Sequence, residues 1–334
     1  MRRSVSAIML ALATGILGPA ISAAASTQRL AAPQPGGFGV RLVDVPVSEA
    51  DNPRALRYII DYLPTGTVIH RRILIMNQET RRVRFTVYPD AASIANGLFT
   101  GDAGDTRNEL TGWISVQHPV VTLAPGASAM DTIRIKVPAG ATRGEHYAII
   151  WVQQTAKARA ANGFGVTEVS RAGVRVYLAV GKGGALPTSF AIASLTARRS
   201  ASGQPLVVAH VDNTGGRAVD LDGSARLARG PGNSSAGPFP AEQIITLAPG
   251  QQGNMTFALP KSLPAGSWQV TINLVSGITT CTATATIQFA PLVAARTGLS
   301  ELAWIGIALG VLVLVLAVAF VIVRYALRHR ATTT

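Results

Sequence analysis

The stretch that decides the fold is written twice in this chain. It reads VVTLAPG at Val120–Gly126 and IITLAPG at Ile244–Gly250. Each copy joins a β-branched run to a Pro-Gly pair, which is the pattern of a strand that ends in a tight turn. A motif that returns with similar neighbours predicts two structural units of one type in tandem.

The neighbours of the two copies follow the same order. After each copy come a strand, a proline, a glycine turn and a strand that carries an aromatic residue. In the first half these are Thr132–Val137, Pro138, Gly144 and Tyr147–Val152, and in the second half Asn254–Leu259, Pro260, Gly266 and Trp268–Leu274. Upstream of each copy, Asn77 and Asn213 close a strand ahead of a turn.

Short strands with Gly and Pro turns fill the rest of both halves. The run Val83–Val87 alternates apolar and polar residues at the period of a half-buried strand. Thr67–Met76 and Arg82–Tyr88 flank the turn Asn77–Arg81, so we expect these two runs to form a hairpin. We predict an all-β fold, with two tandem immunoglobulin-like β-sandwich domains.

The two ends of the chain predict export and anchoring. Leu302–Val323 is an unbroken apolar run that would reach about 33 Å as a helix, and the hydrocarbon core of a bilayer is about 30 Å thick. Arg324 and two further Arg residues follow it, which marks the cytoplasmic side. Met1–Ala25 has an Arg pair, an apolar core and a small-residue cleavage site, as in a secretory signal peptide. We therefore predict a single-pass type I membrane protein with an extracellular ectodomain.

These observations divide the chain into five parts. Turn residues cluster at Gly181–Gly184, where we place the boundary between the sandwiches. The predicted parts are a signal peptide (1–25), a first sandwich (38–182), a second sandwich (186–290), a transmembrane helix (302–323) and a cytoplasmic tail (324–334).

Composition limits the classes of partner. The formal net charge is +13, and a basic exported surface attracts anionic polymers and lipid headgroups. The basic residues are scattered through the predicted strands, so we expect no nucleic-acid partner. The single cysteine, Cys281, excludes an intramolecular disulfide, and we predict that it is a small core residue.

Two long stretches are similar to one known domain. Arg71–Gly101 and Thr122–Val152 resemble the peptidoglycan-binding domain of the WxL-interacting proteins of Gram-positive bacteria. The shared features are a strand that ends in Asn, an Ala-rich loop with an Asn-Gly pair, and the strand pattern around TLAPG. The resemblance extends over most of Phe38–Val180, and the rest of the chain agrees only in its architecture.

This resemblance implies two kinds of partner. One is peptidoglycan or an anionic polymer of the cell wall, and the other is a surface protein that carries a Trp-x-Leu motif. None of the four tryptophans of this chain lies in such a motif, so the chain would be the receptor and not the ligand.

The candidate binding residues lie near the predicted hairpin. Arg side chains suit the carboxylates and phosphates of wall polymers, although a solvated sheet face that discourages edge pairing is the alternative. Asn96 belongs to the Asn-Gly pair of the loop. The predicted set is Arg71, Arg72, Arg81, Arg82, Arg84 and Asn96.

The segment Asp90–Leu110 has no counterpart in the second half. It is rich in Ala, Asn, Gly and Asp and has no hydrophobic period, so we expect a long loop. Such a loop would either recognise the ligand or form a solvated flap.

The chain has no catalytic or metal motif that would identify an enzyme. We therefore predict no catalytic residues, no metal and no cofactor. The favoured function is a non-enzymatic, membrane-anchored binding or scaffolding protein of the bacterial cell envelope. Two alternatives remain: an exported sandwich chaperone or assembly factor for surface proteins, which would use an exposed strand edge, and an exported glycan-processing enzyme with two carboxylates in one cleft.

Overall fold

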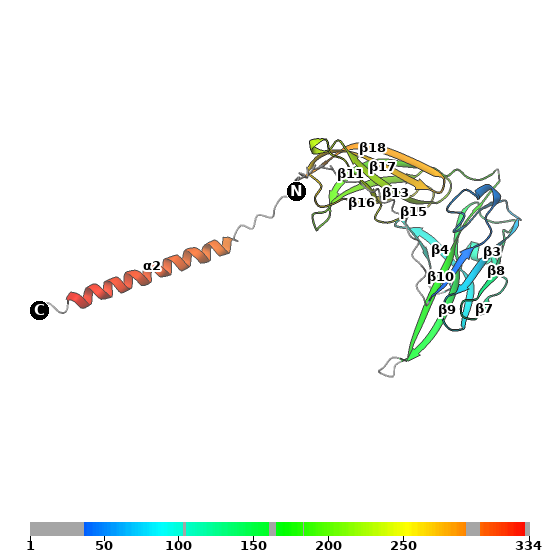
Figure 1. Cartoon of the computed structure of the whole chain (residues 1–334), viewed down its shortest axis with the longest axis horizontal. Helices are drawn as coiled ribbons and strands as arrows, with labels where there is room; N and C mark the ends of the chain where they lie inside the picture. Colours follow the sequence, from blue (N-terminus) through cyan, green and yellow to red (C-terminus); the bar gives the residue numbers. More distant parts are fainter. Residues whose placement is uncertain (1–36, 103–104, 160–164, 183, 292–300, 331–334) are drawn as a thin grey trace, which may run out of the picture.

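The computed structural model describes residues 37–102, 105–159, 165–182, 184–291 and 301–330. Two β-sandwiches follow one another, and a long apolar helix stands at the C-terminal end (Figure 1). The predicted all-β fold with two sandwiches is confirmed. The predicted signal peptide and the last four residues of the predicted tail lie outside the described residues.

The first sandwich packs a four-stranded sheet on a six-stranded sheet. The smaller sheet has the order β1 (Phe38–Leu42), β3 (Val68–Asn77), β8 (Ser128–Lys136) and β6 (Ile114–Val116). The larger sheet has the order β2 (Ile59–Leu63), β10 (Gly165–Val180), β9 (Gly144–Arg159), β4 (Val83–Ala95) and β5 (Leu98–Gly101), and β7 (Val120–Leu123) also pairs with β4. Two short helical turns, η1 (Val47–Glu49) and α1 (Glu109–Trp113), lie between strands.

The second sandwich packs a three-stranded sheet on a five-stranded sheet. The smaller sheet has the order β11 (Phe190–Arg199), β12 (Pro205–Asn213) and β16 (Gln252–Ala258). The larger sheet has the order β14 (Ala236–Pro240), β13 (Val219–Ala228), β17 (Gly266–Ser276) and β18 (Thr279–Phe289), and β15 (Ile245–Leu247) pairs with β13. The turn η2 (Pro231–Asn233) precedes β14.

Each sandwich has its own core, built by strict alternation. Val83, Phe85 and Val87 of β4 are buried, while Arg84 between them is exposed. In the second core Trp268 is almost fully buried, and the partly buried Cys281 packs against that core, as the alternation predicts. Because successive side chains of a strand point to opposite faces, one apolar residue in two is enough to cover the inner face of a sheet.

The predicted hairpin of Thr67–Met76 and Arg82–Tyr88 is wrong. The first run is β3 in the four-stranded sheet, and the second is β4 in the six-stranded sheet, so the connection crosses between the sheets. Both runs alternate, and their apolar residues enter the same core from opposite sides. Alternation identifies the buried face of a strand, but it does not identify the strand's hydrogen-bonding neighbour.

One side chain ties this crossing in each sandwich. The amide nitrogen Nδ2 of Asn77 donates to the carbonyls of Arg81, Leu123 and Ala124, at 2.9, 3.1 and 3.0 Å. Its Oδ1 accepts from the backbone N–H of Glu79 at 3.1 Å. A buried asparagine thus binds the crossing turn and the TLAPG turn together.

Asn213 does the same in the second sandwich. Its Nδ2 donates to the carbonyls of Arg217 and Leu247, both at 2.9 Å, and its Oδ1 accepts from the N–H of Gly215 at 3.0 Å. Asn213 is 2% exposed. The two repeated sequence features, the strand-ending Asn and TLAPG, are therefore the two halves of one contact.

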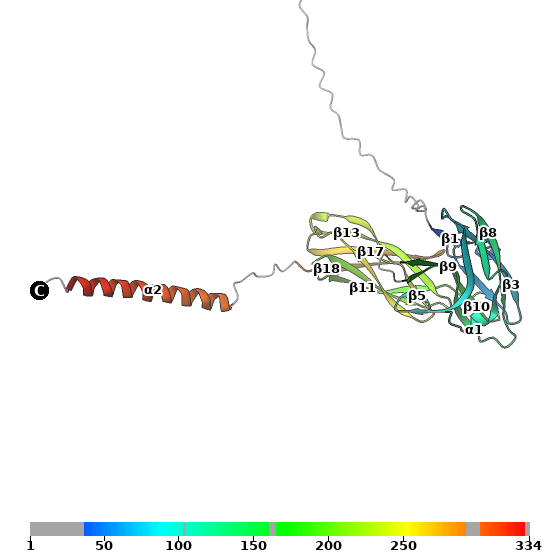
Figure 2. The same cartoon turned by 90° about the horizontal axis from the view of Figure 1, so that it is seen from below.

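The prediction that Asp90–Leu110 is a loop is also wrong. β4 continues to Ala95, turns at Asn96 and Gly97, and returns as β5. Both turn residues have positive φ, 52° and 76°, as an Asn-Gly hairpin turn requires. Asp90, fully buried, accepts hydrogen bonds from Thr106 and from the indole of Trp151. The β4–β5 hairpin is a folded extension that reaches the second sandwich (Figure 2).

The C-terminal helix α2 runs over Glu301–Arg330. Its section Ile305–Arg324 is long and apolar enough to cross a membrane, with a mean hydropathy of 3.2 and no buried share. A helix that is apolar on every side and contacts no core needs an apolar solvent.

Replacing Asn213 by Ala should lower the free energy of unfolding by about 2–3 kcal/mol, because two buried carbonyls lose their donor. The measurement is urea unfolding of the chain in detergent micelles. Asn273→Ala is the matched control, since Asn273 is exposed and accepts only from Thr282. Equal losses for both variants would contradict the role given to Asn213.

Replacing Val313 by Arg should impair membrane insertion, since a central Arg costs about 2.5–3.5 kcal/mol on the insertion scale. Carbonate extraction of membranes measures the fraction of chain that remains embedded. Val47→Arg changes an exposed valine of η1 and should leave that fraction unchanged. Retention of the Val313 variant at the level of the unchanged chain would refute a membrane-spanning α2.

Candidate functional site

The six predicted binding residues do not form one site. Arg71 lies on the inner side of β3 and pairs with the buried Asp61 of β2. Arg72, on the outer side of β3, donates from Nε and Nη2 to the two carboxylate oxygens of Asp44, at 3.0 and 2.6 Å. That contact holds the pKa of the Asp44 carboxyl below its ordinary value. Arg71 and Arg72 therefore already have carboxylate partners within the first sandwich.

The other four predicted residues lie elsewhere. Arg81 pairs with Glu79 at 2.8 Å in the crossing turn. Arg82 and Arg84 are exposed on the six-stranded sheet, so the sandwich separates them from Arg72. Asn96 forms the β4–β5 turn beside the second sandwich. The single Arg cluster expected from a hairpin does not exist, because the hairpin does not exist.

The structure brings together a different set of basic residues. On the outer face of the four-stranded sheet, exposed side chains of β1, β3 and β8 are brought together by the strand pairing. His70 of β3 lies directly opposite Arg134 of β8. Arg134 also lies opposite Ser115 of β6. The exposed basic side chains on this face, called here the basic face, are Arg41, His70, Arg72, Arg134 and Lys136.

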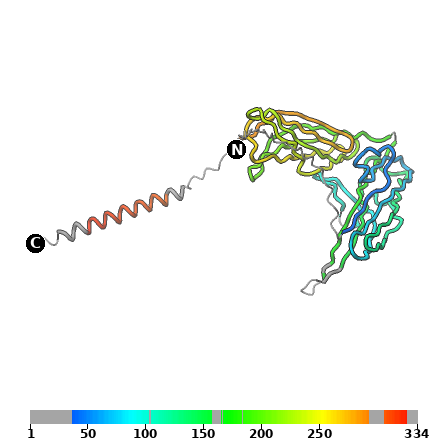
Figure 3. Tube along the Cα trace, viewed as in Figure 1, coloured from blue at the N-terminus to red at the C-terminus, as the bar shows by residue number. Residues whose placement is uncertain are grey.

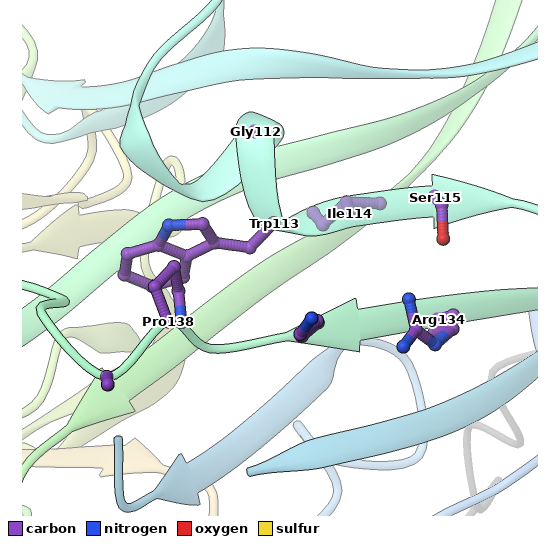
Figure 4. A pocket seen from close by; sticks show the side chains of 8 residues that line it. Gly112, Trp113, Ile114, Ser115, Arg134 and Pro138 are labelled. Atoms are coloured by element: carbon purple, nitrogen blue, oxygen red, sulfur yellow. The ribbon is translucent and has the colours of Figure 1, made fainter. Parts of the chain in front are cut away.

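A shallow hollow of about 470 Å³ adjoins the basic face. Trp113, at the end of α1, and Pro138 line one side, and Ser115 and Arg134 line the other (Figure 4). Lys136 also lines the hollow. Trp113 is 8% exposed, so its ring serves the core more than the surface. The hollow offers two cations and a hydroxyl, a donor set that suits an anion.

A second feature is the long hairpin of β9 and β10. The two strands pair over their whole length, from Gly165 with Arg159 to Val180 with Gly144. β2 covers the outer edge of β10 only at Val176–Val180. Among the described residues no strand pairs with the outer edge of β10 over Gly165–Arg175, and the hairpin extends past its neighbours (Figures 1 and 3).

A third feature is the joint between the sandwiches, centred on Asp220 of β13. Its carboxylate accepts from the Nε of Arg54 at 2.7 Å, the Nη1 of Arg175 at 3.3 Å, and the hydroxyls of Tyr177 and Thr246 at 3.1 and 2.7 Å. Arg54, Arg175 and Tyr177 belong to the first sandwich. The side chains of Arg54 and Asp220 are 9% and 8% exposed. Each buried charge therefore needs the other to offset its loss of hydration.

Further bonds and an apolar cluster complete the joint. The carboxylate of Glu145 accepts from the N–H of Ala218 at 2.6 Å and from the hydroxyl of Tyr147 at 2.8 Å. Burial raises the pKa of Glu145, and these two donors oppose the shift. The β4–β5 extension adds the bond from Thr246 N–H to the Gly97 carbonyl, at 2.8 Å. The apolar cluster takes Ile60, Ile94, Phe99, Ile149 and Tyr177 from the first sandwich and Ala218 from the second.

The described residues hold no group of three or more His, Cys, Asp or Glu side chains that could bind a metal ion. Glu145 and His146 point to opposite sides of β9. Glu145 faces the joint, while the ring of His146 packs against Trp113.

Comparison with known proteins gives structural neighbours only. No protein-family model and no curated protein matches the chain. A chain in the structure of the Salmonella enterica SafA pilin with the SafB chaperone shares 10% identity, with 76% of this chain and 99% of that chain aligned at a TM-score of 0.40. The E. coli chaperone DraB shares 9% identity, with 70% of this chain and 96% of DraB aligned at a TM-score of 0.37. The Pseudomonas aeruginosa CupB2 chaperone shares 13% identity, with 70% of this chain and 97% of CupB2 aligned at a TM-score of 0.35. At TM-scores below 0.5 these likenesses do not identify a function.

The sequence reasoning missed the basic face and the joint. Arg134 and Lys136 alternate with Ile133 and Ile135 in a strand that was predicted, so their shared outward face could have been found. The partners of Asp220 lie far from it in the sequence, and no local pattern indicates them.

Replacing Asp220 by Ala should lower the free energy of unfolding by about 3–5 kcal/mol, because the buried Arg54 and the partly buried Arg175 lose their anion. Thermal or urea unfolding of the whole chain in micelles measures the loss. Asp222→Ala, at an exposed position on the same strand, should stay within about 0.5 kcal/mol of the unchanged chain. A small loss for Asp220→Ala would mean that the joint does not stabilise the fold.

Proposed function

We propose that this chain is a non-enzymatic, membrane-anchored binding protein that takes up an extended segment of a partner protein as an added strand on β10. The observation that carries the proposal is the outer edge of β10 over Gly165–Arg175, with which no strand in the described part of the chain pairs. A strand edge presents a row of unpaired N–H and C=O groups, and an extended peptide satisfies them by continuing the ladder.

The shape of the first sandwich supports this use of the β10 edge. The other strands at its sheet edges are short: β1 and β2 have five residues each, β5 and β7 have four each, and β6 has three. β9 and β10 have 16 residues each, and the outer part of their hairpin pairs with no other described strand. An isolated two-stranded ribbon is marginally stable in water, so a third strand would stabilise it.

The anchor indicates where the partner would be found. With α2 in the membrane and Arg324 at its inner end, both sandwiches stand on the outer side. The partner would then be a surface or secreted protein of the cell envelope. A stable receptor and an assembly factor that later releases its client would use the same edge and would differ only in the lifetime of the complex.

Peptide binding tests the proposal directly. Peptides of twelve residues, selected from a random display library on the full chain in micelles, should slow hydrogen exchange of the Gly165–Arg175 amides. N-methylation of alternate peptide amides should abolish binding, because it removes the donors of the added strand.

The amides of β17, in the second sandwich, serve as the internal control and should exchange at the same rate with and without peptide. Protection confined to another surface, or equal binding of the N-methylated peptides, would refute strand addition on β10.

The basic face favours a second candidate function, the binding of an anionic wall polymer. Its five basic residues lie on one sheet face beside the hollow of Trp113. The resemblance of Phe38–Val180 to the peptidoglycan-binding domain of WxL-interacting proteins adds to this candidate. Exposed charges attract a polyanion in a salt-dependent way, since the Debye length is about 8 Å at physiological ionic strength.

The double change Arg134→Ser and Lys136→Ser should weaken binding to purified cell-wall fragments by about three- to tenfold, since each exposed charge contributes up to about 1 kcal/mol. Sedimentation of the chain with wall fragments at several salt concentrations measures it. Arg82→Ser with Arg84→Ser, on the opposite sheet, is the matched control. If the Arg82 and Arg84 double variant loses as much affinity, the attraction to the wall depends on overall charge, and the basic face is not a specific binding site.

A further inference from the structure

The free edge of β10 leads to one place in the molecule. β2 runs parallel to β10, with Ile59 opposite Val176, so the next residue down, Tyr58, stands opposite Arg175. A strand added to Gly165–Arg175 would therefore lie in line with β2, and one of its ends would meet Tyr58. This geometry fixes what the end of a bound segment would contact, and it rests on the proposed function.

A pocket of about 230 Å³ lies at that point, in the joint between the sandwiches. Its apolar lining comes from both domains: Pro53 and Tyr58 from the first, and Ile244 and Val275 from the second. Arg57 and Asp222 also line it, and both are exposed. The guanidinium of Arg175 lies 5.2 Å from the centre of the Tyr58 ring, so the free edge and the pocket share a boundary.

One large apolar side chain of the pocket lining is left in solvent by the fold, since Ile244 is 51% exposed. Two further exposed apolar residues neighbour lining residues in the sequence: Ile278, next to Gly277, is 72% exposed, and Leu56, next to Arg57, is 54% exposed. Exposed large apolar residues that gather around a concave site indicate a place where another molecule binds.

The charges of the pocket favour an uncharged occupant. Asp220 is already bound by Arg54 at 2.7 Å and by Arg175 at 3.3 Å, and Arg57 and Asp222 carry opposite charges. A charged side chain would lose hydration and would have to compete with these existing ion pairs, whereas an apolar side chain loses only contact with water.

We propose that this pocket holds one large apolar side chain at the end of the partner segment that lies along β10. The β10 edge would supply hydrogen bonds that any sequence can make, and the pocket would select the segment and fix its register. Strand addition alone does not fix register, because a shift by two residues restores every backbone hydrogen bond.

The test uses four synthetic peptides with a common body of alternating Thr and Val, and with Phe or Ser at the first or the last position. Binding is measured on the full chain in detergent micelles. The Phe peptide should bind about tenfold or more tightly than its Ser counterpart at one of the two ends, the factor expected for burying one large side chain. The end that responds gives the direction of the added strand.

Two variants locate the effect. Ile244→Ser should remove the advantage of the Phe peptide and leave the Ser peptide unchanged, and the fold should tolerate it because Ile244 is half exposed. Val120→Ser, at an exposed valine of β7, should preserve the advantage.

The outcomes separate the two proposals. Equal binding of the Phe and Ser peptides on the β10 edge, or a Phe advantage that survives Ile244→Ser, overturns the pocket proposal and leaves strand addition standing. Failure of all four peptides and of library-selected peptides to protect β10 overturns the proposed function itself. A dimer of the chain that Ile244→Ser dissociates would show that a second copy fills the pocket, and would also overturn it.

Discussion

The fold depends on one buried amide that is used twice. A sandwich needs its chain to leave one sheet and enter the other, and the crossing turn leaves carbonyls without partners inside the protein. Asn77 and Asn213 supply the missing donors, and each also binds a backbone carbonyl within TLAPG. Aspartate has no N–H to donate and leucine has no polar atom, so neither could replace the asparagine in these contacts.

The joint between the sandwiches depends on a related constraint, the cost of a buried charge. In a separate domain Asp220 and Arg54 would each lie at a hydrated surface, and docking of the two domains removes both charges from water, which is costly unless they pair. They pair only when the domains meet in one orientation, which also brings together Tyr177, Glu145 and the backbone of Ala218. The two sandwiches therefore hold a fixed angle, and the pocket and the β10 edge are part of one surface.

The sequence predicted the parts of the structure that repeat locally. Alternation predicted that Val83, Phe85 and Val87 are buried, and the two TLAPG copies predicted two similar sandwiches. The hydrogen-bonding neighbours of β3 and β4 were not predicted correctly, because their alternation is the same whether the two strands share a sheet or face each other across the core. Asp90–Leu110 looked like a loop because its strands are short and rich in Ala, and their apolar residues face another domain and not their own core. The predicted Arg site failed with the hairpin on which it depended.

The way the joint is shared has a consequence for the order in which the chain becomes folded. During synthesis the N-terminus emerges first, so the first domain folds before the second is complete. During that interval Arg54 and Tyr177 lack Asp220, and the apolar cluster that contains Phe99 and Tyr177 lacks Ala218, because these second-domain residues come later in the sequence. The newly synthesised first sandwich therefore has an incompletely covered surface at the joint, until β13 and β15 fold and pack against it. Residues 184–291 act on the first domain as a built-in cover, so a chain cut short before β13 would be prone to aggregate.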